Sequence, residues 1–585
     1  MYTFLALLPI LTVLLLLVIM RLPAKVAMPI TYVITAGLAL FVWQADINQI
    51  LAASAKGAIT AISVLFIVFS AILLLNTIKE SGAILALRKG FMDISPDRRI
   101  QAIIVAWLFG CLIEGASGWG TPAMVGVPLL LALGFPAMAA VMCLLIIQST
   151  PVSYGAVGTP ILIGVNTGIG SKEDVIAAIT PQYGTMENYL LQVTADVGLF
   201  HTMVGFLIPL ILCGFLTRFF GEKRSFKQGL EVWPFAIFAG LAFTIPYLLV
   251  AQFWGPEFPS MVGGIVGLAI VVPAAKMGFL MPKETFDFPP KSDWLSDWMG
   301  TVSQDDVKDN EKPRFSMIHA LSPYIIVVIL LVITRTIPEV KKFLTSNFTI
   351  KFTEMFGTKI SHSESLLYTP GTILLLTSII CIVLFKMKGN DVKRSWSSAF
   401  KVMIAAAPAL LFSVPMVQVF INSGSAPDVA EPLKAMPLYL ANSAADLFGQ
   451  AWPIFAPTIG SLGAFIAGSN TVSNMMFAYF QWSTAGQIGL DMAMASKVVA
   501  LQAIGGAAGN MIAVHNVVAA SAVVGLIGKE GSIIRITLIS LSYYIIQGGL
   551  LGMAVIYGGA IWWALAVAWP ISFIAIMCLT SKKAK

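Results

Sequence analysis

Residues 113 to 122 read Ile-Glu-Gly-Ala-Ser-Gly-Trp-Gly-Thr-Pro, and a related polar run, Ile-Ala-Gly-Ser-Asn-Thr-Val-Ser-Asn, occupies residues 466 to 474 of a very apolar chain. In a bilayer, lipid-facing backbone must be hydrogen-bonded within its own helix, so non-helical stretches survive only where they line a cavity or are buried in protein. Paired interruptions of this kind are typical of a transporter's binding site. The two runs therefore predict one site that is built twice.

The composition defines the class of protein. The chain has 585 residues, of which 58% are hydrophobic and 11% charged, and its mean hydropathy is +0.86. Many windows exceed the roughly 20 apolar residues that a spanning helix needs. The net charge of +7 does not indicate nucleic-acid binding, because Lys and Arg gather in short segments between apolar runs. We therefore expect an all-α polytopic protein of the lipid bilayer.

The spans are predicted from hydropathy. Residues 2–20 lack a basic leader and run into Arg21 and Lys25, which favours a first transmembrane helix over a secretory signal. With two broken regions, 100–165 and 450–527, the total is about 12 to 14 membrane segments by span length. The remaining apolar spans lie near 26–43, 58–78, 193–217, 233–251, 255–275, 316–337, 369–387, 402–422, 535–557 and 560–579.

Positive charge predicts the orientation. The segments that are rich in Lys and Arg should be cytoplasmic, which places the N-terminus outside and the C-terminus inside. The basic stretch 335–368 departs from this alternation, but it is long enough to weaken the rule, and we expect it outside. The cytoplasmic segments hold five basic residues in 79–99, four in 218–231, six in 276–315 and five in 386–401.

The parity of the crossings predicts an inverted repeat. Region 100–165 must start inside and end outside, whereas 450–527 must start outside and end inside. Gly115 matches Gly468, and the pentapeptide 155–159 matches 506–510 at a similar offset. Some of these glycines could serve helix packing instead. We expect a first repeat with a linking helix at 1–275, a solvated cytoplasmic linker at 276–315, and a second repeat at 316–585.

The broken regions carry neutral hydrogen-bonding groups. Such groups suit a small anion better than a metal, and no metal site or cofactor is predicted. Half-helix N-termini supply free N–H groups and a positive dipole end for a carboxylate. The alternative is that the hydroxyls only satisfy carbonyls that the breaks set free. The predicted substrate-binding residues are Ser117, Gly118, Thr121, Ser153, Thr159, Ser469, Asn470, Thr471, Ser473, Asn474 and Asn510.

Glu114 is the predicted proton-coupling residue. It follows an apolar run, and an acid within a membrane segment is by default a functional candidate. Removal from water favours the protonated form of a carboxyl. Glu114 could therefore carry a proton with a monocarboxylate. The alternative is an interhelical hydrogen bond or a buried cation as partner, for which Lys497 is a candidate.

Histidines and cysteines are sparse. His515 follows the second break and could donate to a carboxylate, so it joins the predicted substrate-binding residues. His201 is interpreted as an interfacial or packing residue, and no transport role is expected for His319 or His362. The five cysteines lack metal-site spacing and are expected to pack between helices.

The motifs resemble those of the lactate permease family. The similar stretches are 114–122, 151–160, 468–474, 505–511 and 524–530. The resemblance implies a symporter of the bacterial inner membrane that carries L-lactate, and often D-lactate and glycolate, with protons. The triplet 469–471 also resembles the binding motif of sodium-coupled divalent-anion symporters, distant relatives with inverted repeats, so sodium coupling stays open. Some of these relatives are dimers, which makes a homodimer possible.

Two departures concern the second break. Some family members have a lysine where this chain has Asn510, and Pro-Gln where it has Val514-His515. His515 could supply the missing positive character. A remote alternative is an intramembrane serine protease, because 115–118 reads Gly-Ala-Ser-Gly. A protease would not need the counterpart of this stretch in the second half, so we expect no enzyme.

Overall fold

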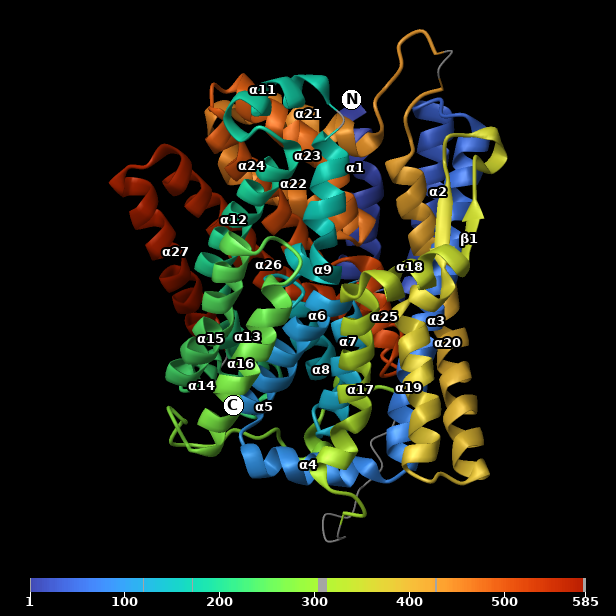
Figure 1. Cartoon of the computed structure of the whole chain (residues 1–585), viewed down its shortest axis with the longest axis vertical. Helices are drawn as coiled ribbons and strands as arrows, with labels where there is room; N and C mark the ends of the chain where they lie inside the picture. The colour runs from blue at the N-terminus through green and yellow to red at the C-terminus, as the bar shows by residue number, and fades with distance from the viewer. Residues whose placement is uncertain are drawn as a thin grey trace.

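Helices make up nearly all of the protein. The computed structural model describes residues 2–20, 22–118, 120–170, 172–302, 313–426 and 429–581. In these ranges, 11 helices are long and apolar enough to cross a membrane, and four shorter apolar helices accompany them. Figure 1 shows most of them running along one common direction. The chain is an all-α, multi-pass membrane protein, and each predicted apolar span coincides with a helix.

The first half holds the first broken region. Its elements are α1 (Tyr2–Val13), η1 (Leu14–Ile19), α2 (Ala24–Gly37), η2 (Leu38–Val42), α3 (Ile47–Glu80), α4 (Ala83–Ile94), α5 (Arg98–Ala102), η3 (Ile103–Phe109), α6 (Gly110–Ser117), α7 (Thr121–Ala132), α8 (Ala137–Ile146), η4 (Val152–Tyr154), α9 (Gly155–Thr159), η5 (Pro160–Val165), α10 (Asn166–Ile169), α11 (Glu173–Tyr183), α12 (Met186–Gly205), α13 (Ile208–Phe220), α14 (Phe226–Leu230), α15 (Trp233–Phe253) and α16 (Pro259–Lys276).

The second half follows a segment with two short 3₁₀ turns. Its elements, with these turns first, are η6 (Lys291–Asp293), η7 (Ser296–Trp298), α17 (Met317–Thr336), α18 (Pro338–Asn347), β1 (Thr349–Phe352), η8 (Met355–Gly357), β2 (His362–Ser365), η9 (Leu366–Tyr368), α19 (Pro370–Leu384), α20 (Gly389–Ile421), α21 (Met436–Phe448), η10 (Gly449–Ala451), α22 (Trp452–Ala467), α23 (Asn470–Gln487), α24 (Met492–Gly509), α25 (Val514–Ala522), α26 (Glu530–Tyr557) and α27 (Ala560–Leu579).

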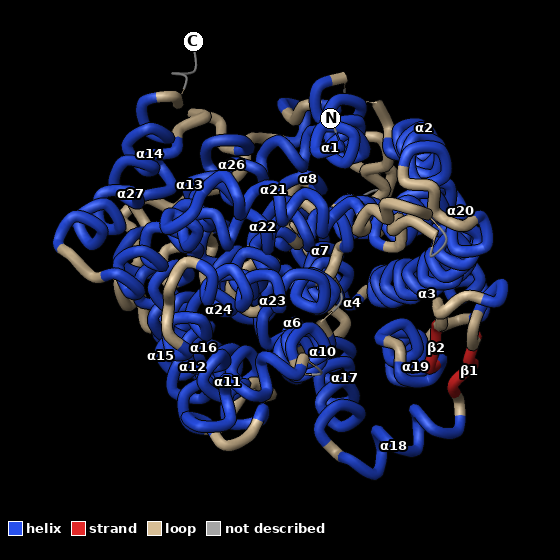
Figure 2. Tube along the Cα trace, turned by 90° about the horizontal axis from the view of Figure 1, so that it is seen from above, coloured by secondary structure: helices blue, strands red, loops and turns tan. Residues whose placement is uncertain are grey.

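The broken regions lie in the middle of the molecule. The spans Arg98–Ala116 and Met492–Ala522 are each 94% buried within the protein, whereas Ala560–Leu579 is only 17% buried. Lipid therefore has almost no access to the irregular backbone beside the first two spans, as a bilayer requires. On one side, α2, α3, α19 and α20 form a separate group, in which α3 packs against both α19 and α20 (Figure 2).

Segments that are rich in Lys and Arg lie at the opposite end of the molecule from segments that are poor in them. Figure 1 places α4 and α14, which belong to the basic segments, at one end of the molecule, and α11 and α21 at the other. The all-helical prediction missed one feature, an antiparallel pair of short strands in the stretch 335–368, where Thr349 pairs with Ser365. The segment Thr-Ile-Lys-Phe that forms β1 alternates polar and apolar residues, which suits a half-exposed strand.

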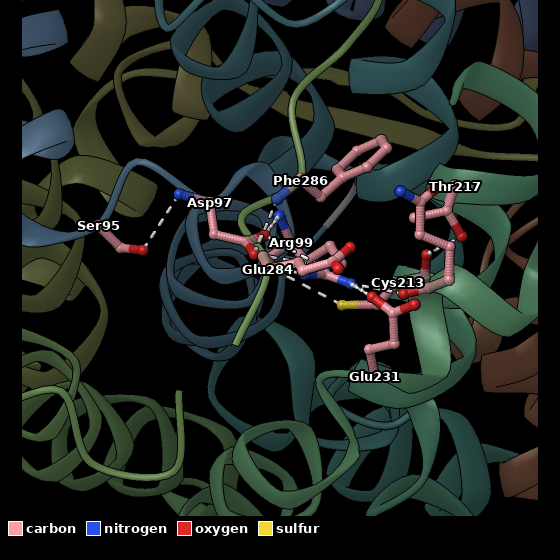
Figure 3. A network of polar contacts seen from close by, with 9 residues as sticks. Ser95, Asp97, Arg99, Cys213, Thr217, Glu231, Glu284 and Phe286 are labelled. Carbon is pink, nitrogen blue, oxygen red and sulfur yellow. Dashed lines mark hydrogen bonds and ion pairs between the residues drawn. The ribbon is translucent and has the colours of Figure 1, made fainter. Parts of the chain in front are cut away.

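The described part of the linker is mostly exposed, and its first part is bound to the helices. Arg99 is buried and donates to Asp97 Oδ2 at 2.7 Å and to the Glu284 carbonyl at 2.7 Å. It also reaches the Gln228 carbonyl at 2.5 Å and Glu231 at 3.3 Å (Figure 3). Five guanidinium donors in a fixed fork can serve several acceptors at once. This arginine therefore joins α5, α14 with the residue that follows it, and the linker.

Candidate functional site

Glycines create the first break. Gly118 has φ +60° and ψ −155°, and Gly120 has φ +69°, so both adopt conformations that only glycine takes readily. α6 ends at Ser117, just before Gly118, and α7 begins at Thr121, just after Gly120, with a proline in its first turn. Proline suits this place because the first helical N–H groups have no partner within the helix. The predicted interruption is confirmed, and it exposes the N-terminus of α7.

The second break repeats this design. α22 ends at Gly468, which is left-handed with φ +63°, and α23 begins at Asn470. Ser469 is the N-cap, and its side chain accepts from the N–H of Val472 at 3.5 Å. The N-terminus of α23 therefore follows a left-handed glycine, as the N-terminus of α7 does.

Each broken region contains a second interruption. The helix α24 ends at Gly509, and α25 begins at Val514. In the first half, Ala156, Val157 and Gly158 are all left-handed, with φ of 47°, 56° and 75°. Non-glycine residues in this conformation are strained and concentrate at functional sites. The pentapeptides 155–159 and 506–510 thus differ in conformation although their sequences match.

The interruptions meet around one cavity of about 390 Å³. Residues from both broken regions form its wall, so segments more than 300 positions apart in the chain build one site. The lining residues are Glu114, Gly118, Gly120, Val152, Gly155, Ala156, Thr159, Pro160, Gly468, Ser469, Asn470, Thr471, Asn510 and Asn516.

Glu114 is the only ionisable residue among the described residues of this wall. It is 2% exposed, and the amide of Gln148 donates to its Oε2 at 3.3 Å. Gly155 lies against its other oxygen. A buried carboxylate with one neutral donor has little compensation for lost solvent. Lys497, the candidate cationic partner in the alternative interpretation, instead lies 3.4 Å from Asp196.

Some of the predicted binding residues line the cavity, and others lie behind its wall. Ser153 is not on the wall, but Asn470 donates to its hydroxyl at 3.2 Å. Ser473 donates to the Gly460 carbonyl of α22 and Asn474 to the Pro160 carbonyl of η5, so both side chains join α23 to a neighbouring element. Thr121 is buried without reaching the wall, and the side chain of Ser117 lies outside the described residues. Six predicted residues line the cavity: Gly118, Thr159, Ser469, Asn470, Thr471 and Asn510.

His515 lies behind the second break. Its ring rests against Gly468, where any side chain would overlap it. It lines a different cavity, of about 380 Å³, with apolar residues such as Ile10 and Phe420. Its predicted contact with the substrate therefore finds no support in the position of its ring.

Several polar residues near the site were not predicted. Asn516 lines the cavity and donates to the Asn510 carbonyl at 3.4 Å. Gln148 contacts Glu114. His201 is fully buried, which agrees with a packing residue and not with an interfacial one, and its Nε2 lies 2.8 Å from Ser153 Oγ. An amide or imidazole inside a long apolar run is the sequence signal that could have found them.

A second, larger cavity adjoins the first. It is open to solvent and spans about 1420 Å³ between α3, the α9–η5 segment and β2. Ala156 and Thr159 belong to both walls. Thr60 and Ser63 line it from α3, and Lys341 and His362 from the stretch 335–368. The small cavity is therefore next to a wide space on one side of the molecule.

Comparison with known proteins shows the family to which the chain belongs. The family model for L-lactate permease matches residues 3–557. A putative L-lactate permease of Haemophilus influenzae is 31% identical over 544 residues, covering 89% of this chain and 92% of its own. The L-lactate permease of Escherichia coli is 28% identical over 555 residues, and a glycolate permease of the same species 27% over 557, each covering 91% of both chains. The chain belongs to the L-lactate permease family.

Proposed function

We propose that the protein is a secondary active transporter that carries lactate, glycolate and similar small 2-hydroxymonocarboxylates together with protons. The cytoplasmic membrane of a bacterium is the proposed location, with the N-terminus outside. Relatives named as L-lactate and glycolate permeases support the substrate class. Their names denote transport, so no proteolytic role is proposed for the Gly-Ala-Ser-Gly stretch.

The cavity wall favours a carboxylate. The residues before α7 and at the start of α23 border it, so two helix N-termini lie beside the same space. The positive ends of two helix dipoles and their free N–H groups attract an anion. The hydroxyls of Ser469 and Thr471 and the amides of Asn470 and Asn510 add neutral polar groups. We propose that these groups hold the substrate.

Glu114 carries the argument for proton coupling. A bound monocarboxylate would share a buried cavity with this carboxyl, and two like charges in one site strongly disfavour double ionisation. One proton on Glu114 removes the repulsion. The anion and the proton then enter as a neutral pair. Sodium coupling through the triplet 469–471 is the competing hypothesis.

Helix packing supports the proposed inverted repeats at 1–275 and 316–585. α2 packs against α20, and α19 packs against α3. Likewise α1 packs against α21 and α17 against α4, while α12 pairs with α15 and α26 with α27. Each contact has its counterpart when α1, α2, α3, α4, α12 and α15 are matched with α17, α19, α20, α21, α26 and α27.

The proposed repeats are not identical, and one difference concerns the second interruption of each broken region. α25 packs against α20, whereas the α9–η5 segment faces α3 across the 1420 Å³ cavity. We propose that this cavity is the access route, and that one repeat moves relative to the other once substrate and proton are bound. In the opposite state of the transport cycle, α9–η5 would pack against α3, and α25 would move away from α20.

The test is lactate uptake into proteoliposomes that contain only this protein, under an inward proton gradient, with internal pH recorded. We expect uptake with internal acidification. Glu114→Gln should abolish gradient-driven accumulation but retain exchange of internal for external lactate, since the amide keeps the shape and loses the proton. Glu222→Gln is the control, because Glu222 is exposed and lines neither cavity. Uptake driven only by a sodium gradient would favour the competing hypothesis.

A further inference from the structure

A buried histidine joins three elements behind the cavity. His201 in α12 is fully buried, with Nδ1 2.6 Å from the hydroxyl of Tyr544 and Nε2 2.8 Å from Ser153 Oγ. The Tyr544 hydroxyl also lies 3.1 Å from Thr150 Oγ1. The ring of Tyr247 packs edge-on against the imidazole. Both ring nitrogens therefore have fixed partners, and the ring cannot turn without losing them.

The chain of contacts continues from His201 to the cavity wall. Ser153 Oγ meets three groups: His201 Nε2, the Ala503 carbonyl at 3.1 Å and the amide nitrogen of Asn470 at 3.2 Å. A serine hydroxyl has one proton and two acceptor lone pairs. In one tautomer of His201 this proton goes to Ala503, and in the other to the imidazole. In both cases Ser153 can only accept from Asn470.

This relation determines how the Asn470 amide is oriented. Its NH₂ group faces Ser153, because an amide oxygen in that place would find no donor while the serine proton goes to Ala503 or to the imidazole. Asn470 Oδ1 then has no hydrogen-bond partner among the described residues, although Asn470 is 2% exposed and lines the cavity. Gly506 packs against this oxygen, and any side chain at position 506 would overlap it. The wall thus contains a buried acceptor without a donor.

A 2-hydroxy acid supplies the missing donor. Its carboxylate can only accept, but its hydroxyl can donate to an amide oxygen. Propionate, which is lactate without the hydroxyl, offers no such donor. A site with a buried polar group that pairs with a substrate hydroxyl rejects the analogue that lacks it.

We propose that His201 is a positioning residue for substrate selection: together with Ser153 it fixes the Asn470 amide, so that its oxygen receives the 2-hydroxyl group of the substrate. This inference rests on the proposed transport of 2-hydroxymonocarboxylates. His201 itself does not touch the substrate. It acts through Ser153, and its removal should therefore alter selectivity without blocking the transport cycle.

The experiment is counterflow in proteoliposomes, with KM and maximal rate determined for lactate and for propionate. We expect the unaltered protein to prefer lactate. His201→Ala should raise the KM for lactate roughly tenfold, as for loss of one hydrogen bond, and leave that for propionate nearly unchanged. His201→Gln should restore the preference, because its amide can donate to Ser153. His319→Ala is the matched control, since His319 Nε2 has no partner in the described part of the chain.

Ser153→Ala is the second variant, for use if His201→Ala does not fold. It removes only the Ser153 hydroxyl and so breaks the same connection between His201 and Asn470. A lactate-to-propionate ratio that stays unchanged in the folded variants would overturn the inference and leave the proposed function intact. Absence of lactate counterflow in the unaltered protein would refute the proposed function and this inference with it.

Discussion

Gly155 lies directly against the carboxylate of Glu114: a Cβ atom at position 155 would come within 2.6 Å of Glu114 Oε1. Gly155→Ala should therefore push the carboxylate aside and break its contact with Gln148. We expect lactate uptake in proteoliposomes to fall roughly tenfold, the effect of about one lost hydrogen bond. Gly486→Ala is the control, because nothing lies within 4 Å of its Cβ position. Equal uptake by the two variants would contradict the proposed importance of the Glu114 position.

Asp196 and Lys497 form a buried ion pair between α12 and α24. The side chains are 6% and 16% exposed, and Ser496 also donates to Asp196 at 2.6 Å. Asp196→Asn should lower the free energy of unfolding by roughly 3–5 kcal/mol, because it leaves an ammonium group buried without a counter-charge. The double variant Asp196→Asn/Lys497→Met should lose less. Thermal unfolding in detergent measures both, and a double variant that is less stable than the single one would contradict this account.

The broken helices could be predicted from sequence because their cause is local. Gly118, Gly120 and Gly468 have positive φ. Glycine adopts this conformation readily, so glycines within a polar run indicate a helix interruption without knowledge of distant contacts. Charge alternation likewise predicted which segments share one end of the molecule, because that pattern depends on the order of the spans.

The partners of the buried polar groups could not be predicted in this way. Asp196 and Lys497 are separated by 301 positions, and His201 and Tyr544 by 343. Hydropathy and motif spacing hold no information about which faces of two distant helices meet. The sequence therefore indicated only an interfacial or packing role for His201, and it left Lys497 as a candidate partner of Glu114. The strand pair was missed because it is short and lies outside the spans.

Arg99 should be more sensitive to a conservative change than a surface arginine. Arg99→Lys keeps the charge but cannot reproduce the bonds to Asp97 and to the carbonyls of Gln228 and Glu284. We expect a loss of about 3 kcal/mol in the free energy of unfolding, from two lost charged hydrogen bonds. Trypsin should also cut the linker faster at the exposed Lys283.

The control for this change is Arg394→Lys. Arg394 pairs with Glu80 at 2.8 Å, but its side chain is 62% exposed. Exposed ion pairs contribute at most about 1 kcal/mol, so this variant should unfold and be digested like the unaltered protein. A similar small effect of Arg99→Lys would show that the linker is held by other contacts.

The larger cavity predicts where reagents gain access. Ser63 is partly exposed on α3 and lines the cavity beside the stretch 335–368, which we expect outside. In intact cells, Ser63→Cys should therefore react with a membrane-impermeant maleimide. Background labelling should be low, because Cys111, Cys143, Cys213 and Cys381 are buried and Cys578 lies near the C-terminus. Excess lactate should slow the reaction at Ser63→Cys if binding moves one repeat and narrows the cavity.

Ser397→Cys is the matched control for access from the other side. Ser397 is exposed near the start of α20, in a segment that we expect to be cytoplasmic. It should react only after the membrane is made permeable, because a charged reagent does not cross the hydrocarbon core. Labelling of Ser397→Cys in intact cells, with none at Ser63→Cys, would reverse the proposed orientation. The large cavity would then be the route to the cytoplasm, since its position between α3 and α9–η5 does not depend on which end faces out.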